Sequence, residues 1–183
     1  GICIIYNGSN GSTYADELII NNCVNNGEIE GDTVAGIIGN SSGNLKLSDC
    51  ENNGAINGRY SAGGIAQCIE NKNSNEAEVS NCINNGNVFG GTEAAGIIDY
   101  AEGITVTNCI NNGNISSNGY VGGIFSYTSS VKGTGLVNNG KISGLEDIGG
   151  ISAYDEGNSI FSKLYNTGVI DEENIGAQVS NLV

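Results

Sequence analysis

Hydrophobic residues along this 183-residue chain come in short runs of strand length, and glycine or asparagine bounds almost every run. Residues 104–107 (Ile-Thr-Val-Thr) and 87–89 (Asn-Val-Phe) are examples, since β-branched or aromatic side chains between turn-forming residues indicate β-strands. A helical repeat would need stretches of about 10–15 residues with a period of 3.6 and few breakers. Breakers recur here roughly every four to eight residues, so the pattern predicts an all-β fold.

The strands belong to an internal repeat marked by the tripeptide Asn-Asn-Gly. Its glycine recurs every 27 to 32 residues, with Asn-Thr-Gly in the last copy, at Gly27, Gly54, Gly86, Gly113, Gly140 and Gly168. Two residues later comes a column of β-branched residues, Ile29, Ile56, Val88, Ile115, Ile142 and Ile170. Four residues before the glycine comes Cys23, Cys50, Cys82, Cys109, Leu136 or Leu164. A Gly-Ile block follows each of the first five copies, and such a fixed period is the signature of a repeat architecture.

These columns predict a parallel β-solenoid of about six coils of 27–32 residues, as a single repeat domain over residues 1–183. Each coil should hold about three short strands that pair with the coils above and below, so that inward Ile, Val and Cys columns form a continuous core. A right-handed wind is expected from the general handedness of parallel crossovers.

The Asn-Asn-Gly column predicts the turns of this solenoid. Asparagine tolerates the left-handed backbone conformation and glycine adopts it freely, so the pair can bend the chain between two strands. Stacked asparagine side chains can then hydrogen-bond from coil to coil, as amide ladders do in cross-β stacks.

The charge balance excludes several classes of function. The chain has 20 acidic and 6 basic residues, a formal net charge of −14 and no histidine. Without histidine there is no Ser-His-Asp triad and no HExxH zinc site. With so few basic residues, binding to nucleic acid or to an anionic membrane surface is not expected, and no apolar run is long enough for membrane insertion.

The repeat also resembles a known family. The block Gly-Gly-Ile followed by a strand, and then Ser-Asn-Cys-x-Asn-Asn-Gly-x-Ile-x-Gly, resembles the GLUG-type repeats of bacterial surface proteins, including regions that flank the protease domain of IgA-specific metallopeptidases. The likeness extends from Gly1 to the vicinity of Gly176. It implies an extracellular bacterial protein, secreted or attached to the cell wall, whose repeats act as a stalk, scaffold or adhesive surface. The metallopeptidase activity is not expected here, because its zinc motif needs histidine.

Both ends of the chain match the middle of a coil. Gly1-Ile2 aligns with Gly36-Ile37, and residues 179–182 repeat the pattern of residues 79–82. We therefore expect a fragment of a longer protein, in which flanking domains cap the solenoid.

Four of the six cysteines, Cys23, Cys50, Cys82 and Cys109, occupy a column that continues as leucine. A position that accepts leucine is a core position, and parallel Cβ vectors keep stacked cysteines too far apart for an unstrained disulfide. We expect buried, reduced, structural thiols. Metal binding is not expected, because neither a CxxC spacing nor a histidine partner is present. Cys3 and Cys68 lie outside the column.

Tyrosines form a second column, at Tyr100, Tyr127 and Tyr154 in three consecutive coils. Stacked tyrosines on a solenoid are most often cross-strand packing. Alternatively, an outward row rimmed by Asp99, Asp155 and Glu156 could bind carbohydrate, with ring faces against the apolar faces of sugars.

Two further features could carry function. Extra residues lengthen two coils at 7–16 and 70–78, and such insertions form either tolerated surface loops or a binding surface. Carboxylates gather near the turn before the Gly-Ile block, at Glu28, Glu30, Asp32, Glu93, Glu146, Asp147, Asp171, Glu172 and Glu173. They favour a solvated acidic edge, although stacked acids could share a calcium ion. No other cofactor is expected.

Two functions remain open from the sequence. The regular repeat favours a non-catalytic surface module, an adhesin scaffold or stalk with a glycan or a host protein as ligand. The alternative is a polysaccharide-active β-helix lyase or hydrolase that uses Asp99, Glu102 and Asp155, because glycoside hydrolysis needs only two carboxylates. Ice binding would need a regular Thr-x-Thr column, and only residues 105–107 fit it.

Overall fold

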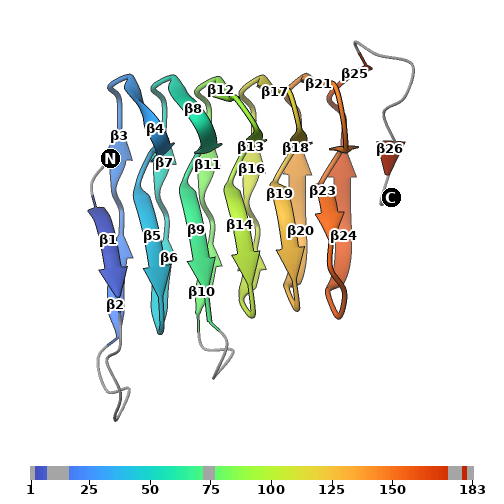
Figure 1. The fold of residues 1–183 in the computed structure, drawn as a ribbon. Coiled ribbons are helices and arrows are strands. Elements are labelled where there is room, and N and C mark those ends of the chain that lie inside the picture. Colours follow the sequence, from blue (N-terminus) through green and yellow to red (C-terminus); the bar gives the residue numbers. More distant parts are fainter. Residues whose placement is uncertain (1–2, 8–16, 72–76, 173–178, 181–183) are drawn as a thin grey trace.

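The computed structural model describes residues 3–7, 17–71, 77–172 and 179–180 and shows a stack of similar coils in chain order (Figure 1). The described residues form only strands and connecting turns, and every strand pairs in parallel with its equivalent in the next coil. The prediction of an all-β parallel solenoid with about six coils is confirmed. No helix in the described ranges could span a membrane.

Three sheets, which we name A, B and C, run the length of the stack. Sheet A takes one strand from each coil: β1 (Cys3–Asn7), β5 (Ile38–Ser42), β9 (Ala66–Glu70), β14 (Ile98–Glu102), β19 (Phe125–Ser129) and β23 (Ser152–Asp155). Sheet B contains β2 (Leu18–Asn21), β3 (Val24–Asn25), β6 (Leu45–Ser48), β7 (Glu51–Asn52), β10 (Glu78–Ser80), β11 (Ile83–Asn84), β15 (Thr105–Thr107), β16 (Ile110–Asn111), β20 (Lys132–Asn138) and β24 (Ile160–Asn166). Sheet C contains β4 (Ile29–Ala35), β8 (Ile56–Gly63), β12 (Val88–Gly90), β13 (Glu93–Ala95), β17 (Ile115–Ser117), β18 (Tyr120–Gly122), β21 (Ile142–Gly144), β22 (Ile148–Gly149), β25 (Ile170–Glu172) and β26 (Val179–Ser180).

The register between coils follows the sequence repeat. Ile56 pairs with Ile29 on one side and with Val88 on the other, and Ile115 continues the same column. The longer interval between the second and third copies leaves this register intact, because the extra residues lie between β9 and β10. The sequence columns are therefore rows of side chains along the solenoid axis.

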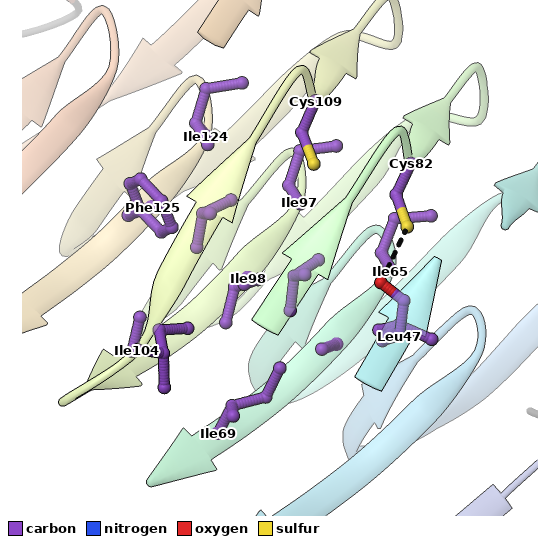
Figure 2. Packing of buried hydrophobic residues seen from close by; sticks show 14 of the residues in the cluster. Leu47, Ile65, Ile69, Cys82, Ile97, Ile98, Ile104, Cys109, Ile124 and Phe125 are labelled. Atoms are coloured by element: carbon purple, nitrogen blue, oxygen red, sulfur yellow. Dashed lines mark hydrogen bonds between the residues drawn. The ribbon is translucent and has the colours of Figure 1, made fainter. Parts of the chain in front are cut away.

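The apolar core has two parts. The larger part lies between sheets A and B and includes Phe125, Ile98 and the buried cysteines (Figure 2). The smaller part lies inside sheet C, where residues such as Val88 and Ala94 from the two strands of one coil meet. Full burial of an isoleucine or valine contributes about 1.5–3 kcal/mol, so the repeated columns supply much of the stability.

A row of asparagines, which we call the inner ladder, runs between the two parts of the core, and its four central members are fully buried. It consists of the first asparagine of each Asn-Asn-Gly copy and its equivalent in the last coil: Asn25, Asn52, Asn84, Asn111, Asn138 and Asn166. In the first five members, the side-chain Nδ2 donates to the Oδ1 of the next member at 2.7–2.8 Å. In all six, Nδ2 also donates to the carbonyl of the glycine two residues later, at 2.8–3.3 Å. Both N–H groups of the first five members are thus satisfied, as burial requires.

The glycines of the Gly-Ile blocks make room for the inner ladder. A Cβ atom at Gly96 would lie 2.4 Å from Cγ of Asn111, and one at Gly64 would lie 2.6 Å from Cγ of Asn84. Gly123 stands in the same relation to Asn138. The Gly-Ile motif and the Asn-Asn-Gly motif are therefore in contact within each coil, with the glycine of the first motif packed against the first asparagine of the second.

The prediction that Asn-Asn-Gly takes the left-handed conformation is wrong. The left-handed residue lies three positions before the first asparagine, directly before the cysteine or leucine column, where φ is 52° to 54° at Asn22, Asp49, Asn81, Asn108 and Lys163. Asparagine and aspartate tolerate this conformation, and here it joins the two segments of sheet B.

The Asn-Asn-Gly glycines are needed for close approach. A Cβ atom at Gly113 would lie 1.9 Å from the carbonyl oxygen of Gly86 in the coil before it. Gly54, Gly86, Gly140 and Gly168 have equally close neighbours, whereas the nearest atom at Gly27 is 3.8 Å away.

Replacing one member of the inner ladder should destabilise the solenoid strongly. Asn111→Ala removes three hydrogen bonds and leaves buried polar atoms of Asn84, Gly113 and Asn138 without partners. We expect a loss of about 3–5 kcal/mol, measured by urea denaturation followed by circular dichroism. Asn112→Ala is the matched control, because its hydrogen bonds are exposed and water can replace them, and it should cost less than about 1 kcal/mol. Equal losses for the two variants would contradict a special role for the inner ladder.

The glycine column offers a second test. Gly113→Ala forces a methyl group against the Gly86 carbonyl and should lower the melting temperature sharply or prevent folding. Gly27→Ala, at the open end of the same column, should be tolerated. If thermal melts show both variants to be equally stable, close approach between coils is not the reason for these glycines.

Candidate functional site

The structure brings the three predicted tyrosines into one row on sheet A. Tyr100 of β14 pairs with Tyr127 of β19, which pairs with Tyr154 of β23. The rings of Tyr100 and Tyr127 stack with centroids 4.6 Å apart and an interplanar angle of 7°, and those of Tyr127 and Tyr154 with centroids 5.4 Å apart at 29°. Tyr100 and Tyr127 are half-buried and Tyr154 is 42% exposed.

Stacking changes what this row can offer to a ligand. Both faces of the Tyr127 ring are covered by its neighbours, so a sugar cannot stack on it in the way that the sequence suggests. The row instead presents ring edges and phenol groups. Ring edges carry partial positive charge, which attracts the oxygen atoms of a ligand.

Carboxylates fix the phenol groups of the row. The Tyr100 hydroxyl donates to Oε2 of Glu102 at 3.1 Å. Burial, followed by the charge of Glu102, raises the pKa of Tyr100. A hydrogen bond to Glu156 raises the pKa of Tyr127 to about 12. Both phenols therefore remain protonated donors at neutral pH, and the exposed Glu156 lies beside the row.

A fourth tyrosine joins the row from another sheet. Tyr120 of β18 lies with its ring centroid 5.9 Å from that of Tyr154, at an interplanar angle of 58°. The sequence gives no periodic signal for it, because the equivalent positions in the preceding coils are Ser61 and Glu93. The contact is evident only from the structure, in which sheet C approaches sheet A at this corner.

Asp99 does not rim the tyrosine row, contrary to the prediction. Its exposed fraction is 0%, and it accepts hydrogen bonds from Ser126 and from Nε2 of Gln67, the latter at 3.3 Å. The reason lies at the corner before β14, where Ile97, Ile98 and Asp99 are consecutive and all fully buried. The amides of both isoleucines donate to the carbonyl of Ile124, which interrupts the alternation of the strand.

Burial makes Asp99 an unusual carboxyl group. Desolvation raises the pKa of Asp99 to about 7, and the Ser126 hydrogen bond partly opposes this shift. A side chain without solvent contact cannot touch a polysaccharide, so Asp99 cannot serve as a catalytic carboxylate of a polysaccharide lyase or hydrolase. Asp155 is exposed, as predicted, and accepts hydrogen bonds from Thr128 at 3.0 Å and Ser159 at 2.6 Å.

The cysteine column lies in the core as free thiols. Cys50, Cys82 and Cys109 are buried and Cys23 is half-buried at the first coil. Each sulfur donates to the carbonyl two residues before it, at 3.1–3.4 Å. The neighbouring Cys109 thiol and burial raise the pKa of Cys82 to about 12, so this thiol stays protonated and unreactive. Cys68, outside the column, is also buried, and the side chain of Cys3 lies outside the described residues.

The predicted acidic edge is dispersed over the turns of sheet C. Asp32 forms an ion pair with Arg59 at 3.3 Å, and Glu28 accepts a hydrogen bond from Asn57 at 2.7 Å. Glu93 accepts one from Ser61, and Asp171 forms an ion pair with Lys141. Glu30 and Glu146 are exposed, Asp147 is half-buried, and the side chains of Glu172 and Glu173 lie outside the described residues. Among the described residues, no three acidic or thiol groups converge on one point.

The two insertions occupy equivalent places in the order of the strands. The first follows β1 and precedes β2, and the second follows β9 and precedes β10, so both join sheet A to sheet B (Figure 1). Asn7, Glu70 and Glu78 are strand residues, whereas residues 8–16 and 72–76 lie outside the described ranges.

Comparisons with known proteins found no matching family model, curated protein or solved structure. The resemblance to GLUG-type repeats therefore remains a prediction from the sequence motifs.

The buried carboxyl group should make stability depend on pH. Because the folded-state pKa of Asp99, about 7, lies above the ordinary value of 3.8, the folded protein binds this proton more tightly than the unfolded chain does. The Asp99 contribution therefore favours folding at pH 4 and is lost as the pH rises through 7. Relative to the wild type, Asp99→Asn should gain about 2–4 kcal/mol in unfolding free energy between pH 4 and pH 8.

Urea denaturation at four pH values between 4 and 8 measures this difference. Glu30→Gln, at an exposed carboxylate, is the control and should follow the wild type at every pH. A constant difference between Asp99→Asn and the wild type would show that Asp99 is not a buried titrating group.

Proposed function

We propose that this chain is a non-catalytic repeat module of a bacterial cell-surface or secreted protein, a rigid adhesin scaffold or stalk between flanking domains. The observation that carries this proposal is the unbroken coil-to-coil bonding, in which the inner ladder alone links the six coils through five side-chain hydrogen bonds. A rod built in this way holds its two ends at a fixed separation. That is the mechanical requirement of a stalk.

Two further observations support the setting of the module. The resemblance to GLUG-type repeats implies an extracellular bacterial location. The net charge of −14 keeps a repetitive β-protein soluble and discourages pairing between copies.

The tyrosine row is the proposed adhesive surface of this scaffold. Tyr127 and Tyr100 present ring edges and phenols, and Glu102 and Glu156 add carboxylate oxygens that can accept hydrogen bonds from a ligand. Sugar hydroxyls or the polar side chains of a host protein fit this set of donors and acceptors. Calcium could bridge the carboxylates to a glycan, so the binding test includes it.

A binding screen against glycans and host matrix proteins, with calcium and with a chelator, tests the proposal. Tyr127→Ala should weaken saturable binding at least tenfold, because it removes the middle of the row. Tyr60→Ala removes a tyrosine that is 53% exposed on sheet C and should leave binding unchanged. Equal binding by the wild type and Tyr127→Ala, or no binding by the wild type, would overturn the tyrosine row as an adhesive site.

A further inference from the structure

A second surface of the solenoid lies on the outer face of sheet B. Ile83 of β11, Ile110 of β16 and Val137 of β20 pair in register and form an aliphatic row. They point outward because the residues on either side of each, such as Cys82 and Asn84, are buried in the core and in the inner ladder. The exposed asparagines two positions later, Asn85, Asn112 and Asn139, form a parallel row. We call the two rows together the sheet B stripe.

Asn112, in the middle of the amide row, has hydrogen-bonding groups that the ladder does not use. Asn112 donates to Asn85 and Asn139 donates to Asn112, both at 2.8 Å. An asparagine side chain has two N–H groups and two acceptor lone pairs. The ladder uses one of each on Asn112, which leaves a donor and an acceptor directed to solvent. Asn139 likewise keeps one N–H and one lone pair, whereas Asn85 donates its second N–H to Glu51, so the unused groups occur in two adjacent coils about 4.8 Å apart.

The aliphatic row ends in an exposed aromatic ring. Tyr165 of β24 pairs with Val137 and is 60% exposed. Thr167, which donates to Oδ1 of Asn139 at 2.7 Å, continues the polar row in the same coil. Apolar and polar rows thus run side by side across four coils.

The stripe is uncharged on a strongly acidic molecule. Residues 81–85, 108–112 and 135–139 contain no charged side chain, although the chain carries a net charge of −14. Glu51, in the coil before, pairs with Ile83 and accepts a hydrogen bond from Asn85 at 2.8 Å, and Lys163 lies in the coil of Tyr165, so the charge-free part of the stripe is these three coils. An anionic polymer would be repelled by the rest of the surface, and a cationic one would prefer the acidic turns. The ligand that fits is therefore neutral, with an apolar face, hydrogen-bonding edges and a repeating unit.

We propose that the sheet B stripe binds a neutral linear glycan lying along the solenoid axis. The apolar faces of its sugars would contact Ile83, Ile110 and Val137, with one sugar stacked on the Tyr165 ring. Sugar hydroxyls would exchange hydrogen bonds with the free groups of Asn112 and Asn139. The stripe lies on a different face from the tyrosine row, and glycan binding to the stripe does not depend on binding to the tyrosines.

Binding to neutral cello- and chito-oligosaccharides and to anionic oligogalacturonate, measured by calorimetry on the whole chain, tests the proposal. Ile110→Lys should weaken binding of a neutral oligosaccharide at least tenfold. Phe89→Lys, at an apolar side chain exposed on sheet C, should leave it unchanged, and Tyr127→Ala reports separately whether the tyrosine row contributes. Thermal melts verify that each variant is folded. If Ile110→Lys does not fold, nuclear magnetic resonance of the wild type replaces it, with the Asn112 and Asn139 side-chain amides expected to shift on titration.

Several results would overturn the proposal. They are the absence of binding to both neutral oligosaccharides, equal binding of oligogalacturonate, or binding that Ile110→Lys leaves unchanged. Neutral binding that only Tyr127→Ala abolishes would place the glycan on the tyrosine row instead. Shaping of ice crystals by a protein that binds neither neutral oligosaccharide would assign the stripe to ordered water.

Discussion

A buried asparagine side chain is stable only if both of its N–H groups find acceptors, and this requirement fixes the distance and register between coils. In Asn111, one N–H bonds to the next coil and the other to the Gly113 carbonyl. The residue that faces the Asn111 amide from the opposite side must be glycine, here Gly96, because a Cβ atom there would overlap the amide. The Gly-Ile and Asn-Asn-Gly motifs, which look independent in the sequence, are thus coupled by one contact. The register of the strands and the packing of both parts of the core depend on this contact.

The strict register has a consequence for the surface. Any side chain that recurs at one position of the repeat becomes a row along the axis, whatever its chemistry. Tyrosines form such a row on sheet A, and aliphatic and amide side chains form others on sheet B. A change at an outward position leaves the inner ladder untouched. This separation of scaffold from surface is what suits a solenoid to presenting extended binding faces.

The sequence predicted the columns because repetition reveals which residues share a row. It predicted the solenoid, the amide ladder and the alignment of Tyr100, Tyr127 and Tyr154. It failed at the corner before β14: Asp99 is enclosed where two neighbouring amides share one carbonyl acceptor, an arrangement that recurs in the other coils but that the pattern of side chains does not reveal. Tyr120 was missed because its neighbours in the preceding coils are not aromatic, and the stripe because outward isoleucines look the same in sequence as inward ones.

Hydrogen exchange of asparagine side-chain amides, resolved by nuclear magnetic resonance, tests the inner ladder most directly. We predict that Asn52, Asn84, Asn111 and Asn138 exchange only through opening of the coils, since these side chains are fully buried and both of their N–H groups are hydrogen-bonded. The exposed Asn53, Asn85, Asn112 and Asn139 should exchange far faster under the same conditions. Equal exchange rates in the two rows would contradict the claim that buried amides hold the coils in register.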